Sequence, residues 1–271
     1  MIRREIRPPG QDPQWLLISQ VEHARLSAQL AERCLDQFGQ PAQEGSDLTA
    51  VRQELLAAIL HHDDGWSTWD KYPQLDPEHH RPPSFREMPL EKVLPIWSGS
   101  IEAAAELGNL AGLIVADHFL ALFDATDKET ETAAAKSWQS EMVARKAQWF
   151  ADWREANPVL HSAALAAEAL QWLQLLDVMS LWLCSACPGE DEPLAELPVS
   201  YHFGQDGFLE VTLKCADSPG CVTVTPWRFD GAELAMEVNG YVAPARPYEN
   251  VAALKAAQRR HVIRWNLVKD P

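Results

Sequence analysis

The chain has 271 residues, of which 46% are hydrophobic, and it carries a formal net charge of −16. This length suits one large domain or one domain with a smaller appendage, and the apolar content is sufficient for a buried core. A surface this acidic repels phosphate backbones and anionic lipids. Nucleic acid and membrane surfaces are therefore excluded as general partners.

The cysteines and the N-terminus favour a cytoplasmic protein. Five cysteines, an odd number, indicate reduced thiols, and the single Cys184-x-x-Cys187 pair lacks a second pair at zinc-ribbon spacing. Residues 1–15 are partly basic but contain no apolar signal-peptide segment. The longest apolar stretch, 169–187, includes two glutamines and an aspartate, so it fits a buried helix better than a membrane span.

Helical periodicity dominates the first two thirds of the chain. A Ser19-x-x-Glu22 capping signal begins a helix that extends to about residue 38, and a polar linker follows. The proline-rich stretch 66–95 predicts a long irregular loop. Apolar spacing predicts further helices at 48–62, 100–107, 110–123, 128–156 and 162–186.

The pattern changes to short strands after Pro198. Segments separated by Gly, Asp and Pro predict strands at 199–203, 208–214, 222–226 and 234–238, then a helix at 251–258 and a strand at 262–268. We therefore predict an α+β protein that is mainly a helical bundle. The helical domain covers residues 1–197, and a small antiparallel β segment, residues 198–271, packs on it.

Several polar residues lie on faces of these helices that are otherwise apolar. His62 extends the stripe of Leu55 and Ile59, and His118 lies four residues after Ile114. Asp177 shares its stripe with leucines, Asp63 directly follows His62, and His23 lies one turn into the first predicted helix.

Burying a charge without compensation costs several kcal/mol, and a bound cation offsets that cost. Taken singly, a buried histidine can also be a core residue that is held by hydrogen bonds, and a buried aspartate can be one partner of an ion pair. The complete order, His23, His62-Asp63, His118 and Asp177, each on its own helix, instead favours a metal site.

This order resembles the HD superfamily of metal-dependent phosphohydrolases, in which an apolar helix ends in His-Asp-x-Gly, here His62 to Gly65. The resemblance implies a helical fold and a metal held by His23, His62, Asp63 and Asp177. It also implies a second metal held by His118 and by a loop histidine, His80 or its neighbour His79. The chain is more closely similar to an uncharacterised bacterial family of unknown function.

One position departs from the HD pattern. Many HD hydrolases have a lysine after His-Asp-x-Gly, whereas this chain has Trp66. We expect substrate contacts from residues of the following loop, in which aromatic side chains form a pocket wall and cations approach a phosphate. These residues are Trp66, Trp69, Lys71, Tyr72 and Arg81.

The leading hypothesis is a metal-dependent hydrolase of a small, phosphorylated molecule, in which Asp64 orients the attacking water. The cofactor is one or two divalent transition-metal ions, and Mn, Fe, Zn and Ni all fit the ligand types. One alternative is a dinuclear iron oxygenase that uses all six ligands. Another is a non-catalytic module for ligand binding or assembly. The sequence is compatible with a homo-oligomer.

Overall fold

The computed structural model describes residues 1–8, 10–39, 47–126, 132–190, 192, 200–203 and 209–270. Some predicted features fall at least partly outside these ranges: most of the linker, the start of the helix predicted at 128–156, the first residues of the strands predicted at 199–203 and 208–214, and the boundary between residues 197 and 198. The division into two domains stays a prediction.

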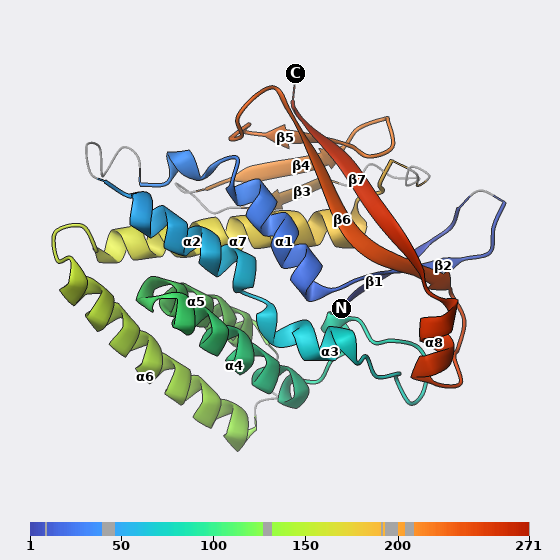
Figure 1. Cartoon of the computed structure of the whole chain (residues 1–271), viewed down its shortest axis with the longest axis horizontal. Coiled ribbons are helices and arrows are strands. Elements are labelled where there is room, and N and C mark those ends of the chain that lie inside the picture. The colour runs from blue at the N-terminus through green and yellow to red at the C-terminus, as the bar shows by residue number, and fades with distance from the viewer. Residues whose placement is uncertain are drawn as a thin grey trace.

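The helices form layers beneath a curved sheet (Figure 1). Helix α1 contacts strand β6 of the sheet and α7 contacts β1 and β3, whereas α6 packs on α4 and α5 on the side away from the sheet. The helix α2 lies between these layers, in contact with α1, α4, α5 and α7. The bounds are α1 (Gln20–Ala31), α2 (Thr49–His61), α3 (Ser67–Lys71), α4 (Leu90–Leu107), α5 (Asn109–Asp124), α6 (Ala133–Ala156), α7 (Ala163–Ala186) and α8 (Val251–Ala257).

The described strands form one seven-stranded sheet in the order β1-β2-β6-β7-β5-β4-β3. Neighbouring strands are antiparallel except β5 and β7, which are parallel. On β6, residues alternate between buried and exposed, and the buried set packs on the helices. The bounds are β1 (Ile2–Ile6), β2 (Gln14–Ile18), β3 (Ser200–Phe203), β4 (Val211–Cys215), β5 (Cys221–Thr225), β6 (Glu233–Pro244) and β7 (Arg259–Lys269).

The α+β class is confirmed, but the sheet is larger than the predicted C-terminal segment and is not wholly antiparallel. Two of its strands, β1 and β2, come from the N-terminus, where we predicted no strand. Strand β2 is buried on both faces: Leu16 and Ile18 pack into the main core, and Trp15 and Leu17 pack with Leu254 of α8. The β segment and the helical body therefore share one sheet.

The prediction of an irregular loop over 66–95 was wrong at both ends. Residues 67–71 form α3, and α4 begins at Leu90 and contains Pro95. A proline lacks the N–H that would bond to the carbonyl four residues earlier, here Glu91. Pro95 and Glu91 are both exposed, so water can hydrate that carbonyl. In the part of the chain that the structure describes, no helix combines the length and apolarity needed to cross a bilayer.

Candidate metal centre

Five buried side chains from four helices meet between α1, α2, α5 and α7. His23 lies in the first turns of α1, His62 caps the C-terminus of α2, and Asp63 follows it. His118 comes from α5 and Asp177 from the middle of α7. Each of the five is at most 6% exposed. The sequence prediction that these residues lie on apolar helix faces is therefore matched by where the structure places them.

The turn after α2 fixes the direction of His62 and Asp63. Residues Asp64–Trp66 form a 3-10 turn that lies against α4, where the Gly65 amide donates to Ser100 Oγ at 3.0 Å. A Cβ atom at Gly65 would lie 2.0 Å from the Ile96 carbonyl oxygen. Glycine at this position therefore allows the close approach that holds the end of α2 beside the other ligands.

Asp177 is the centre of the cluster. Its Oδ1 atom lies 3.2 Å from Nε2 of His23 and 3.2 Å from Nε2 of His62. Its Oδ2 atom lies 3.8 Å from Nε2 of His118. Asp63 Oδ2 approaches His23 Nε2 at 3.3 Å, and one ligand atom from each of His23, His62 and Asp63 lies within 4.8 Å of the other two.

Hydrogen bonds fix where the protons lie on two of the histidines. His62 Nδ1 is 2.7 Å from the Ile59 carbonyl oxygen, which can only accept, so Nδ1 carries a hydrogen. Ser180 Oγ donates its hydrogen to the Asp177 backbone carbonyl at 2.9 Å, and therefore accepts from His23 Nδ1 at 2.6 Å. In neutral rings, both Nε2 atoms would then be acceptors that lie 3.2 Å from the acceptor Asp177 Oδ1. Only an additional proton or a cation between them makes this arrangement favourable.

The charges of the metal-free cluster follow from the same contacts. Burial lowers the pKa of His62, but Asp63 and Asp177 outweigh it and raise that pKa to about 9. Burial also opposes charge on His23, yet Asp177 and Asp63 raise its pKa. Burial raises the pKa of Asp177, but His23 and His62 hold it well below the usual range. For His118, burial prevails and lowers the pKa.

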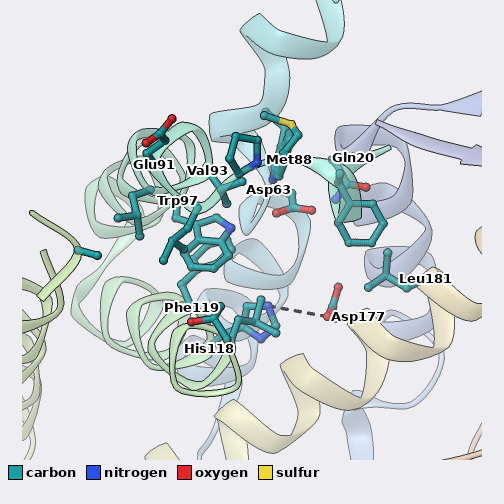
Figure 2. A pocket seen from close by; sticks show the side chains of 18 of the residues that line it. Gln20, Asp63, Met88, Glu91, Val93, Trp97, His118, Phe119, Asp177 and Leu181 are labelled. Carbon is teal, nitrogen blue, oxygen red and sulfur yellow. Dashed lines mark ion pairs between the residues drawn. The ribbon is translucent and has the colours of Figure 1, made fainter. Parts of the chain in front are cut away.

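The cluster opens into a cavity of about 620 Å³ (Figure 2). His23, Asp63, His118 and Asp177 line it together with side chains that are mostly apolar. Figure 2 shows Trp97 across the cavity from Asp177 and Leu181. This volume lies within the roughly 300–1,000 Å³ of small-molecule sites. The arrangement can hold a cation at one wall of a pocket and a small molecule in the rest of it.

The structure brings one of the five predicted substrate-binding residues to the cavity. Trp66 is buried and lines it. Trp69 packs against the core. Tyr72 is 62% exposed, and the ammonium groups of Lys71 and Lys255 lie 5.4 and 5.6 Å from the centre of its ring. Arg81 pairs with Glu87 at 2.9 Å. Trp69, Lys71, Tyr72 and Arg81 are not among the described lining residues.

Two further predicted residues also lie apart from the cluster. His80 is exposed on a turn with φ of 52°, where its amide donates to the Asp76 carbonyl and its carbonyl accepts from Tyr248. No contact among the described residues connects it to Asp177. Asp64 Oδ2 lies 2.8 Å from His61 Nδ1, and Asp64 is not among the described residues that line the cavity. The structure thus gathers five of the six predicted ligands and leaves Asp64 outside the pocket.

Sequence reasoning missed most of the pocket. Gln20, at the start of α1, is buried and lines the cavity, and its amide oxygen Oε1 has no hydrogen-bond partner. The rings of Trp97 and Phe119 stack with their centroids 5.2 Å apart and form part of the apolar wall. Apolar side chains that line a cavity give the same sequence pattern as core residues. Gln20 alone carried a signal, because it is a polar residue directly after the Ser19 cap.

The fold and the cluster together define an α+β protein with a buried His/Asp site at the wall of a largely apolar pocket. Residues 1–244 match the family model described as "Protein of unknown function (DUF3891)", and the chain belongs to this family. The resemblance to the HD superfamily was wrong, because the matching family is DUF3891 and the sheet of seven strands is not an HD-like helical bundle. No curated protein and no solved structure matches the chain significantly.

Proposed function

We propose that this protein is a metal-dependent hydrolase of a small molecule, with one divalent cation held by His23, His62, Asp63 and Asp177. The proposal is supported by the convergence of two histidines and two aspartates that are all buried at one wall of a cavity. It does not depend on family membership, because the family has no assigned activity.

One observation carries the metal assignment. Nδ1 of His23 and Nδ1 of His62 both donate to oxygen acceptors, and both Nε2 atoms lie 3.2 Å from Asp177 Oδ1. Metal-binding histidines commonly donate their second N–H to a carbonyl or similar acceptor, which fixes the tautomer and aims the other nitrogen at the metal. His23 Nε2 has no hydrogen-bond partner in the structure although it is buried, which fits a ligand atom.

The residues around the cation have separate tasks in this proposal. Asp63 and Asp177 supply two negative charges that balance a dication, and Ser180 orients His23. When bound, the cation polarises the scissile group and makes water more acidic. His118 borders the cavity, with Nε2 3.8 Å from Asp177 Oδ2, and in this proposal it takes a proton from the attacking water.

A dinuclear iron centre of the kind considered above needs six ligands. The residue predicted as the sixth, His80, lies on an exposed turn away from the cluster. Metal analysis separates these proposals, because a dinuclear centre binds two ions per chain and a mononuclear one binds one. A purely structural or binding module would hold its cation without turning over any substrate.

The test is elemental analysis of purified protein, followed by chelation and reloading with Mn²⁺, Fe²⁺, Zn²⁺ or Ni²⁺. We expect one ion per chain, and hydrolysis of chromogenic esters or phosphoesters that is lost on chelation and restored by one of these metals. His62→Ala should remove the ion, whereas His61→Ala, at the adjacent half-exposed histidine, should retain it. An equal metal content in the two variants, or activity that chelation leaves intact, overturns the proposal.

A further inference from the structure

The walls of the cavity restrict which substrate it can accept. The side chains opposite the cluster are mainly hydrocarbon or aromatic, and Trp97 and Phe119 stack with ring planes 24° apart. Leu122, at the end of α5, lines the cavity while 42% exposed, which places it at the mouth. A substrate that reaches the cluster therefore buries an apolar body against these side chains. The remaining apolar lining comes from Trp66, Phe85, Met88, Pro89, Leu90, Val93, Leu94, Ala135 and Leu181.

The charges in the cavity disfavour an anion. Asp63, Asp177 and Glu91 line it, and none of the described residues that line it is a lysine or an arginine. Two carboxylates neutralise a dication, and Glu91 adds a further negative charge near the mouth. A phosphate monoester carries about −1.5 to −2 charges near neutral pH and is normally bound by arginine, lysine or several backbone N–H groups. Here it would meet neither an arginine nor a lysine among the described lining residues.

Gln20 is an uncharged polar residue of the cavity lining. It is only 3% exposed, and its Oε1 atom is buried and has no hydrogen-bond partner. Figure 2 shows Gln20 on the same side of the cavity as Leu181, with Asp63 nearby. An unpaired buried amide costs free energy, and a turn of this side chain that presents Oε1 to a ligand's donor recovers this cost. The carboxamide binds a neutral polar group without adding charge.

We propose that the substrate is an uncharged carboxylic ester or amide with an apolar acyl or aryl group, rather than a phosphoester. This inference rests on the proposed hydrolase function and specifies its substrate class. The apolar group lies against Trp97 and Phe119, and the carbonyl lies beside the metal ligands. The water oxygen forms a bond to the carbonyl carbon, and the bond from that carbon to the leaving oxygen or nitrogen breaks. The proton of the water passes to the leaving group, and no oxidant or reductant is needed.

Hydrolysis is tested on the metal-loaded protein with p-nitrophenyl butyrate, hexanoate and octanoate, and with p-nitrophenyl phosphate. We expect kcat/KM to rise about fourfold for each methylene that the cavity buries, which corresponds to its transfer free energy. The phosphate should react at least about a hundredfold more slowly than the best ester. Faster hydrolysis of the phosphate, or no dependence on chain length, overturns the substrate class even though the hydrolase proposal stands.

Binding provides a readout that does not require turnover. Octanamide should bind the metal-loaded protein in calorimetry, and octyl phosphate should bind at least tenfold more weakly. Gln20→Leu should weaken octanamide binding several-fold without changing the metal content. Octanamide binding with no hydrolysis of any ester overturns the hydrolase proposal and supports the ligand class, whereas tighter binding of octyl phosphate overturns the ligand class.

A pair of surface variants tests the charge argument. Leu122→Lys places a cation at the mouth of the cavity and should narrow the preference for octanamide over octyl phosphate several-fold. Leu107→Lys makes the same change at a leucine of similar exposure, 45%, that is not among the described lining residues, and should leave the preference unchanged. Equal effects of the two lysines would contradict the assignment of this cavity as the binding site.

Discussion

His62 Nε2 lies 3.2 Å from Asp177 Oδ1, although 115 residues separate the two in the chain. Both side chains are buried, and His62 cannot donate from Nε2 when it is neutral, because its hydrogen is on the Nδ1 atom that bonds to the Ile59 carbonyl. The contact therefore fits either an ion pair with a doubly protonated ring or two ligands of one bound cation. The two states respond in opposite directions to mutation and pH.

Asp177→Asn should remove metal binding and lower the melting temperature of the metal-loaded protein. With free metal at a hundred times Kd, the wild type gains about 2.7 kcal/mol, or roughly 5–10 °C for a chain of this size. The amide is a poor ligand for a dication, so the variant loses this gain. Calorimetry with and without chelator should show a much smaller difference between the two proteins after chelation.

The matched control for this variant is Asp117→Asn. Asp117 is on α5 next to His118, but it pairs with Lys146 at 2.6 Å near the surface. We expect unchanged metal content in Asp117→Asn and a small effect on stability, as is usual for exposed ion pairs. A higher melting temperature for Asp177→Asn, together with full metal content, would make Asp177 a structural residue only.

The stability of the metal-free protein should fall as pH rises from about 6.5 to about 9. The pKa of His62 in the folded chain is raised from 6.5 to about 9, so its contribution to stability is complete below 6.5 and is lost as pH approaches 9. The raised pKa of His23 acts in the same direction. Thermal unfolding in chelator at several pH values measures this slope, and His62→Gln should flatten it.

Metal binding should have the opposite pH dependence. The histidines must lose their protons to bind a cation, so the metal-induced rise in melting temperature should grow between pH 6.5 and 9. A rise that is constant with pH would show that neither His23 nor His62 releases a proton when the metal binds.

The sequence predicted the cluster better than it predicted the pocket or the sheet. Polar residues such as His118 and Asp177 stand out on apolar helix faces, and their burial alone indicates that they need partners. The partners of β1 and β2 could not be inferred in this way. β2 pairs with β6, more than two hundred residues later, and a short strand buried on both faces lacks the alternation that marks most strands.

The error about the HD superfamily has a related cause. The order His, His-Asp, His, Asp on successive helices reflects the residue types that bind metals. Unrelated folds can present the same residue types in the same order. What separates this chain from a helical bundle is the sheet that packs on α1 and α7, and its pairings are not visible in local patterns. Pro95 led to the prediction of a loop where α4 begins. A proline is tolerated there because it is exposed, and the sequence alone does not reveal that exposure.

Gly65→Ala should destabilise the protein by about 3 kcal/mol, as measured by urea unfolding, because the added methyl group would overlap the Ile96 carbonyl of α4. The shift of the turn should also move Asp63 and weaken metal binding. Gly99→Ala is the control on the facing helix: its Cβ would meet only the Gly65 Cα, at 3.4 Å, an ordinary contact. We expect a change of less than about 1 kcal/mol for Gly99→Ala. Similar losses in the two variants would show that the close approach at Gly65 is not what positions the turn.

His118→Gln tests how many cations the site holds and what this histidine does. Its Nε2 atom is 3.8 Å from Asp177 Oδ2, farther than the 3.2 Å that separates His23 or His62 from the other oxygen of Asp177. If His118 accepts the proton of the attacking water, the variant should keep one ion per chain while kcat falls about a hundredfold or more. The residual rate should then recover partly with added imidazole, and His61→Gln should behave like the wild type. If His118 is instead a ligand of a second ion, the wild type should bind two ions and the variant one. That result would contradict the mononuclear assignment and would give His118 the ligand role that the sequence first suggested.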